Sequence, residues 1–112
     1  MSIAKTGTAP YYAVIFTSVR TEEDNGHQKM ADAMFELAAK QPGYLGVESA
    51  GEDFGITVSY WESLEAIAAW KENVAHVAAQ RLGRDAWYSM YKTRVCRVER
   101  DYVYEASQNC CE

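Results

Sequence analysis

The sequence has few of the features that mark membrane-spanning or secreted proteins. Its 112 residues include only three cysteines, and two of these, Cys110 and Cys111, are adjacent. An odd number of cysteines in this arrangement does not suit the disulfide framework of a small secreted domain. The most apolar early run, Tyr11–Phe16, is far shorter than the roughly 20 residues of a membrane crossing, and residues 1–10 have no apolar signal-peptide core. We therefore expect a cytoplasmic protein without a membrane partner.

Positively charged residues are also fewer than negatively charged ones. Eleven Lys and Arg residues stand against sixteen Asp and Glu residues, which gives a net charge of −5. This balance argues against a nucleic acid partner, because nucleic-acid-binding domains are usually basic. The sequence has no phosphate-binding loop, nucleophile elbow or G-x-G-x-x-G motif. Cys96 has no flanking histidine or second cysteine at metal-ligand spacing, so we expect it to be a buried thiol that binds no metal.

What the sequence has in excess is aromatic residues, with eight tyrosines and three tryptophans. Most of them fall in segments that predict β-strands. Successive strand residues point to opposite faces of a sheet. One parity of these rings is therefore expected to line a cavity beneath the helices, and the other to fill a dimer interface.

The hydrophobic pattern divides the chain into a β-α-β-β-α-β order. β-Branched and aromatic residues predict strands at 11–19, 44–50, 56–61 and 86–104, the last as one long strand or two consecutive ones. Apolar residues at helical spacing predict two helices. One starts at Thr21–Asp24 and ends before Pro42, and the other has Ser63 as its N-cap and Gly83 as its C-cap. Asn73 is a candidate break in the second helix. This order predicts a ferredoxin-like α+β domain.

The predicted domain spans residues 11–104, between a flexible leader (1–10) and a polar tail (105–112). The first strand is apolar at both parities, with Ala13 and Ile15 on one side and Val14 and Phe16 on the other. A sheet buried on both faces produces this pattern. Two helices cover only one face, so the second cover is expected to be another copy of the chain, in a homodimer packed sheet against sheet.

A series of short motifs gives the chain a family likeness over about residues 11–104. These are Trp61-Glu62-Ser63, Trp70-Lys71, Gly83-Arg84, Trp87-Tyr88 and the run 95–100, preceded by the turn Pro42-Gly43-Tyr44. With them the chain resembles the antibiotic biosynthesis monooxygenase (ABM) superfamily, in its YqjZ-like branch. The resemblance implies a dimeric α+β barrel. It also implies a cofactor-independent monooxygenase that acts on a small aromatic or quinol-like compound, in which the substrate's own phenolate reduces oxygen.

Four residues are candidates for a site of this kind. An unperturbed imidazole, with a pKa of about 6.5, suits a general base near neutrality, which makes His76 a candidate. Glu72 and Gln80 lie one helical turn to either side of it. The alternative for His76 is a solvated helix residue or a helix cap near Asn73. Trp61 and Trp70 are expected to form a cavity wall, although Trp70 also fits a core stripe.

The fourth candidate is Tyr88, which could donate a hydrogen bond to an oxyanion of the substrate. Tyr88 and Tyr91 are expected to point to opposite faces of the sheet. Lys92, Arg94, Arg97 and Arg100 place positive charge on the last strand. These cations could hold an anionic ligand, or balance Asp85, Glu99 and Asp101 across a dimer edge.

Two other functions stay open. One is a non-catalytic, ligand-binding or stress-linked dimer of the same fold. The other is haem binding or haem degradation, which the resemblance makes less favourable. Haem-degrading relatives carry an iron-ligating histidine ten residues after a tryptophan equivalent to Trp70, where this chain has Gln80. Those relatives also have an asparagine on the first strand, and residues 11–19 contain none.

Overall fold

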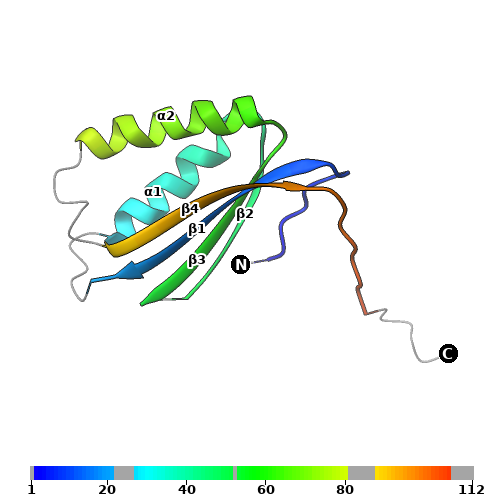
Figure 1. The fold of residues 1–112 in the computed structure, drawn as a ribbon, viewed down its shortest axis with the longest axis horizontal. Helices are drawn as coiled ribbons and strands as arrows, with labels where there is room; N and C mark the ends of the chain where they lie inside the picture. Colours follow the sequence, from blue (N-terminus) through cyan, green and yellow to red (C-terminus); the bar gives the residue numbers. More distant parts are fainter. Residues whose placement is uncertain (1, 22–26, 52, 81–87, 107–112) are drawn as a thin grey trace.

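The computed structural model describes residues 2–21, 27–51, 53–80 and 88–106, apart from the side chains of residues 27, 28, 30 and 75–80. The elements are β1 (Tyr11–Arg20), α1 (His27–Ala39), β2 (Tyr44–Ala50), β3 (Phe54–Trp61), α2 (Leu64–Gln80) and β4 (Tyr88–Val98). They form one antiparallel sheet in the order β2-β3-β1-β4. Both helices lie on the same face of this sheet (Figure 1). The predicted ferredoxin-like α+β fold is confirmed.

The strand boundaries follow the predictions closely at the start of the chain and less closely at its end. β2 has the predicted bounds, β1 is one residue longer, and β3 begins two residues earlier, at Phe54. The last strand was predicted to reach Tyr104, but β4 ends at Val98. Residues 99–106 leave the sheet, although Tyr102, Val103 and Tyr104 are residue types that favour strands.

The helix boundaries are set by local hydrogen bonds. The Ser63 hydroxyl accepts a hydrogen bond from the Ala66 backbone N–H at 3.0 Å, which confirms the predicted N-cap of α2. The predicted break at Asn73 is wrong, because α2 runs without interruption from Leu64 to Gln80. Asn73 instead donates its side-chain amide to the side-chain oxygen of Gln41 at 2.9 Å, which ties α2 to the turn after α1. The predicted start of the first helix, Thr21–Asp24, falls largely outside the described residues, and so does Gly83, the predicted C-cap of the second helix.

The core lies between the sheet and the helices. Its buried centre consists of Ala38, Trp61 and Ile67, and Tyr12, Val14 and Tyr44 pack against it from the sheet. Trp61 has no exposed surface at all. Within the described part of the chain, neither helix is long and apolar enough to cross a membrane.

A β-bulge changes which way the start of β4 faces. Val19 pairs with Met90, but the next residue of β1, Arg20, pairs with Tyr88, so Ser89 is an extra residue on β4. The prediction that Tyr88 and Tyr91 point to opposite faces is therefore wrong. Both rings contact Phe16, at centroid distances of 5.5 and 5.2 Å.

The sheet face opposite the helices, called the open face below, is covered at one end by the chain's own termini. The Ala4 backbone N–H donates to Glu48 at 2.9 Å, and the Tyr60 hydroxyl donates to the other oxygen of Glu48 at 2.7 Å. The Tyr11 hydroxyl donates to Asp101. Because of this cover, Tyr11 is only 5% exposed although no helix lies on its side of the sheet.

The other end of the open face is uncovered. Val19, Phe54 and Met90 are neighbours across three strands, and Ile56 lies two residues along β3. Phe54 and Met90 are 59% and 65% exposed. The four side chains Val19, Phe54, Ile56 and Met90 form what is called the apolar patch below.

Candidate functional site

Aromatic rings gather at two places on the helix-facing side of the sheet. The inner cluster contains Trp61, Trp70 and Tyr44. The Trp61 and Trp70 rings stack with their centroids 5.8 Å apart and their planes inclined by 26°, and Tyr44 meets Trp61 edge-on at 5.6 Å. The structure therefore brings two of the predicted site residues, Trp61 and Trp70, into direct contact.

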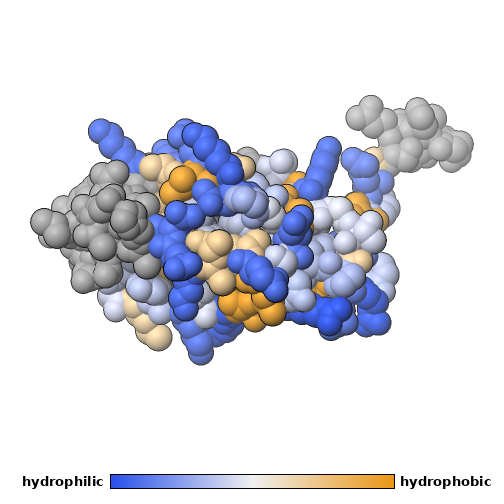
Figure 2. Space-filling view, turned by 90° about the horizontal axis from the view of Figure 1, so that it is seen from above, coloured by the Kyte–Doolittle hydropathy of each residue, from blue (hydrophilic) through white to orange (hydrophobic). Residues whose placement is uncertain are grey.

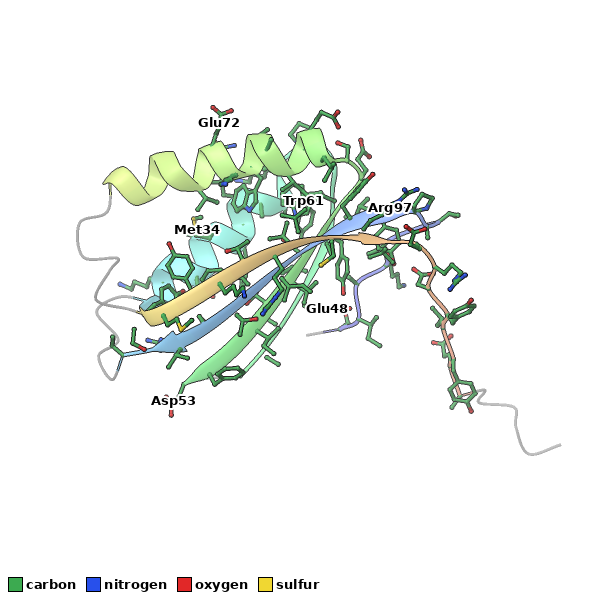
Figure 3. All side chains as sticks on the ribbon, viewed as in Figure 1. Met34, Glu48, Asp53, Trp61, Glu72 and Arg97 are labelled. Carbon is green, nitrogen blue, oxygen red and sulfur yellow. The ribbon has the colours of Figure 1, made fainter. Side chains whose placement is uncertain are left out.

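Trp61 and Trp70 differ in what they can reach. Trp61 is completely enclosed, and its indole N–H donates to the Ser59 hydroxyl at 2.9 Å. Figure 3 shows it between the sheet and the helices. Trp70 is partly exposed and covers one side of the Trp61 ring. Of this pair, only Trp70 presents surface to a ligand, while Trp61 fixes the position of Trp70.

The outer cluster contains Phe16, Tyr88 and Tyr91. Tyr88 and Tyr91 meet edge-on at 5.8 Å, and both pack against Phe16. Tyr91 is 54% exposed, so this cluster opens to solvent along β4. The sequence offered a signal for Phe16, which shares its parity with Tyr12 and Val14. It offered none for Tyr91, because strict alternation along β4 places Tyr91 and Tyr88 on opposite faces. The bulge at Ser89 is what brings both rings to the same face.

The two clusters are separate. Phe16 lies four residues along β1 from Tyr12, which pairs with Trp61, and at about 3.3 Å per residue this places the clusters roughly 13 Å apart. Tyr88 therefore does not join Trp61 and Trp70 in one contact group. A ligand that touched both clusters would have to span the stretch of sheet between them.

That stretch carries hydroxyl groups. On the helix-facing side, Ser59 pairs with Val14 and Thr57 pairs with Phe16. Ser49 on β2 shares a hydrogen bond with Thr57 at 2.8 Å between the two hydroxyl oxygens. Residues of β2 and β3 that face helices are expected to be apolar in an ordinary core, because a buried hydroxyl has to be hydrogen-bonded. The row Ser49, Thr57 and Ser59 is a polar strip between two aromatic clusters, and sequence reasoning did not single it out.

Electrostatics keep the site tyrosines protonated. Burial raises the pKa of Tyr88 above its usual value, and the nearby Arg20 opposes this only in part. Burial also raises the pKa of Tyr44. A phenol with a raised pKa is neutral near pH 7 and acts as a hydrogen-bond donor. Tyr88 can therefore donate to an oxygen anion, and is a poor proton acceptor.

The surroundings of His76 are only partly described. His76 belongs to α2, but its side chain lies outside the described residues, as does that of Gln80. Glu72, one helical turn before His76, is exposed and projects from the side of α2 that faces away from the sheet (Figure 3). Seen from above, the helical layer presents mainly hydrophilic residues with small hydrophobic patches (Figure 2).

The described residues offer no ready metal site. Across residues 2–21, 27–51, 53–80 and 88–106, no group of three or more His, Cys, Asp or Glu side chains lies close enough together to hold a metal ion. A surface groove is present elsewhere, between residues 7–9 of the leader and residues 99–102. It lies at the end of the open face and takes in none of the four predicted site residues.

The family model for antibiotic biosynthesis monooxygenases matches residues 10–82, which is most of the domain just described. The chain belongs to the antibiotic biosynthesis monooxygenase family. The predicted resemblance to this family is confirmed. A curated relative, the uncharacterized protein YqjZ of Bacillus subtilis, is 48% identical over 109 residues and covers 96% of each chain.

Solved structures share the family fold at low sequence identity. PA3566 from Pseudomonas aeruginosa has a TM-score of 0.65 at 12% identity, covering 85% of this chain and 98% of its own. SnoaB, a cofactor-independent oxygenase from Streptomyces nogalater, has a TM-score of 0.62 at 14% identity, covering 93% and 100%. MhuD, a heme-degrader from Mycobacterium tuberculosis, has a TM-score of 0.55 at 19% identity, covering 81% and 99%. At these identities, the likeness establishes the ABM fold alone.

Proposed function

We propose that this ABM protein is a cofactor-independent monooxygenase that acts on a small aromatic or quinol-like compound. The observation that carries the proposal is the helix-facing side of the sheet, where a strip of hydroxyl groups separates two aromatic clusters. Aromatic side chains suit the faces of a planar substrate, and hydroxyls suit its ring oxygens. The family membership and the fold shared with SnoaB, a cofactor-independent oxygenase, support the same choice.

The proposed roles follow from where the residues lie. Trp70 forms the wall that contacts the substrate ring, and Trp61 holds Trp70 from behind. Tyr88 donates a hydrogen bond to a substrate oxygen that becomes negatively charged, since its phenol stays protonated near neutral pH. His76 is the proposed proton acceptor, because an imidazole can take up a proton near pH 7.

The chemistry that these roles serve can be written for an anthrone, whose ring carbon carries two hydrogens. Loss of one proton to His76 leaves an electron-rich anion, which gives electrons to dioxygen. One oxygen atom is retained as the new carbonyl, and the other leaves as water with the two hydrogens. Oxygen is thereby reduced by the substrate's own four electrons. The protein binds the ring, accepts the proton and stabilises the developing anion.

We also propose that the chain forms a homodimer through the open face, and that it works in the cytoplasm. The support for the dimer is the apolar patch, in which Phe54 and Met90 are more than half exposed. A contiguous group of exposed apolar residues marks an interaction surface more often than a solvated one. Sedimentation of the full chain at micromolar concentration tests this, and a monomer there would contradict it.

Oxygen uptake with a panel of hydroquinones and anthrones tests the activity. We expect uptake that Trp70→Ala and His76→Ala each lower by at least about tenfold, since each removes a group placed at the substrate. Lys71→Ala is the matched control, because Lys71 is an exposed neighbour of Trp70 on α2. Uptake that neither Trp70→Ala nor His76→Ala changes would remove this site assignment, and no uptake with any compound would favour a non-catalytic dimer.

Haem binding is the second candidate, since MhuD, a heme-degrader, shares the fold. Gln80 is a poor iron ligand, so we expect added haemin to give no stable shift of its Soret band. A stable shift that His76→Ala abolishes would favour haem binding over the proposed monooxygenase activity.

A further inference from the structure

One row of side chains crosses the helix-facing side of the sheet between the two aromatic clusters. The register places Val95 of β4 beside Val14 of β1. It places Ser59 of β3 between Val14 and Val47 of β2. Directly paired residues of neighbouring antiparallel strands point to the same face of a sheet. These four side chains are called the central row below, and Ser59 is its one polar member among three valines.

The central row is open at its β4 end. β4 is an edge strand, and Val95 is 53% exposed. Val14, Ser59 and Val47 are also partly exposed, although both helices lie on this side of the sheet (Figure 1). Two strand spacings of about 4.8 Å separate Val95 from Ser59, so Ser59 lies roughly 10 Å in from the edge strand. A planar ring that enters over β4 therefore passes two valines before it reaches a hydroxyl.

The hydrogen bonding of Ser59 makes its hydroxyl a donor. Its oxygen accepts the Trp61 indole N–H at 2.9 Å, and the fully enclosed Trp61 ring fixes the place of that oxygen. An indole nitrogen can only donate, so Trp61 cannot accept a hydrogen bond in return. In the part of the chain that the structure describes, no group accepts the hydrogen of the Ser59 hydroxyl. Ser59 therefore offers one hydrogen, at a defined place, to an acceptor on a ligand.

Ser59 is also the hydroxyl of the polar strip that contacts the inner aromatic cluster. The other two hydroxyls of the strip, those of Ser49 and Thr57, are hydrogen-bonded to each other. Thr57 lies two residues along β3, about 7 Å from Ser59. Ser59 instead contacts Trp61, whose ring stacks on Trp70. The donor at Ser59 is thus next to the ring pair that forms the proposed substrate wall.

We propose that Ser59 determines the specificity of the site by donating a hydrogen bond to an oxygen on the inward edge of a planar ring. The ring lies over Val14, and its opposite edge points out past Val95. A ligand without an acceptor oxygen leaves the Ser59 hydroxyl without a partner in a place that the ring shields from water, so it binds more weakly. This inference rests on the proposed function, and adds to it which edge of the substrate lies inward.

Binding of two compounds with the same carbon skeleton tests the role of Ser59. Anthrone has a ring carbonyl, and 9,10-dihydroanthracene has two hydrogens at that carbon. Equilibrium dialysis of the full chain under nitrogen, which prevents oxidation, gives a dissociation constant for each compound. The preference for anthrone is the constant for 9,10-dihydroanthracene divided by the constant for anthrone. In Ser59→Ala, we expect this preference to fall at least about tenfold, because the lost hydrogen bond affects anthrone alone. An unchanged preference would overturn the proposal.

Further variants separate the hydroxyl from its structural role. Ser59→Thr keeps the hydroxyl and is expected to keep the preference within about threefold. Ser59→Cys has a similar size but a weak donor, so we expect it to lose most of the preference, and it replaces Ser59→Ala if loss of the Trp61 contact prevents folding. Thr17→Val is the matched control, because it removes a hydroxyl from β1 on the open face, where Thr17 pairs with Ile56. Equal losses in Ser59→Ala and Thr17→Val would contradict a specific role for Ser59.

Oxygen uptake distinguishes this inference from the function on which it rests. A preference for anthrone that depends on Ser59, in a protein that takes up no oxygen, would support the binding role and contradict the monooxygenase. Oxygen uptake by a protein whose preference is unchanged in Ser59→Ala would support the monooxygenase and overturn the role of Ser59. Binding of neither compound would overturn the inference, and oxygen uptake would then decide the proposed function alone.

Discussion

The two faces of the sheet are covered by different kinds of interaction. On the helix-facing side, cover comes from apolar packing, with Trp61 fully buried between Trp70 and Tyr44. On the open face, cover at one end comes from hydrogen bonds that tether the chain's own termini, through Glu48 and Asp101. The other end of the open face, with Phe54 and Met90, has no cover. One domain thus completes its core with helices, fastens its termini with polar contacts, and leaves one apolar area exposed.

The largest loss of stability is expected for a substitution on the packed, helix-facing side of the sheet. Trp61→Ala removes the fully buried ring at the centre of the core, and we expect it to lower the free energy of unfolding by about 3–5 kcal/mol. Urea denaturation followed by circular dichroism measures this. A loss below about 1 kcal/mol would mean that Trp61 is not the centre of the core.

The polar tether is expected to contribute less than the packed core. Glu48→Ala removes the acceptor of both the Tyr60 hydroxyl and the Ala4 backbone N–H, and we expect a loss of about 1–3 kcal/mol of unfolding free energy. Glu36→Ala, an exposed carboxylate on α1, is the control and should change little. The same denaturation experiment compares the two. Equal values for both variants would show that the leader is held by something other than Glu48.

The ionisation of Tyr60 tests the same contact with Glu48. Burial, the hydrogen bond to Glu48 and the negative charge of Glu48 together raise the pKa of Tyr60 to about 12. The unfolded tyrosine ionises near pH 10, so the folded state binds more protons between about pH 10 and 12 and its stability falls as the pH rises through that range. In Glu48→Gln, we expect the pKa of Tyr60 to fall but to stay above 10, because burial remains. Ultraviolet titration of tyrosinate absorbance measures both values, and an unchanged pKa would contradict the contact.

A smaller effect is expected at the start of α2, which carries Trp70. Ser63→Ala removes the oxygen that accepts the Ala66 backbone N–H, and we expect it to cost about 1 kcal/mol of unfolding free energy. Ser63→Asp keeps an acceptor at this place and should retain most of that stability. The pair is compared by thermal unfolding, and equal losses in both variants would show that the cap contributes nothing.

The smallest effect on folding is expected at the apolar patch. Phe54→Ser replaces a side chain that is 59% exposed, so we expect the unfolding free energy of the monomer to change by no more than about 0.5 kcal/mol. Dimerisation should weaken in the same variant, which sedimentation over a range of concentrations measures. A large loss of monomer stability would mean that the patch already packs within a single chain.

Much of the fold could be predicted because its signals are local. The bounds of β2, the N-cap at Ser63 and the order of elements all follow from patterns of a few neighbouring residues. Helical and strand periodicity describe one element at a time and do not show which elements become neighbours. The end of β4 differs from the prediction because Tyr102, Val103 and Tyr104 favour strands by residue type, whereas the pairing of β4 with β1 ends at Val98.

The site was predictable only in part. Trp61 and Trp70 could be paired because a strand end and the following helix are close in sequence. Tyr88 could be chosen, but not its neighbours, because a single extra residue at Ser89 decides the face on which Tyr88 lies. The polar strip of Ser49, Thr57 and Ser59 depends on which strands become neighbours. His76 and Gln80 stay predictions, since their side chains lie outside the described residues.

The family, the βαββαβ order and the excess of aromatic rings on strands could all be inferred from the sequence without the structure. Those properties depend on residue type and spacing along the chain. The tertiary structure alone decided how the rings divide into two clusters about 13 Å apart, and how the termini cover one end of the open face. It also left side chains of β4 and of residues 102–104 exposed. These outcomes depend on strand order, register and one bulge, which bring together residues that are distant in sequence.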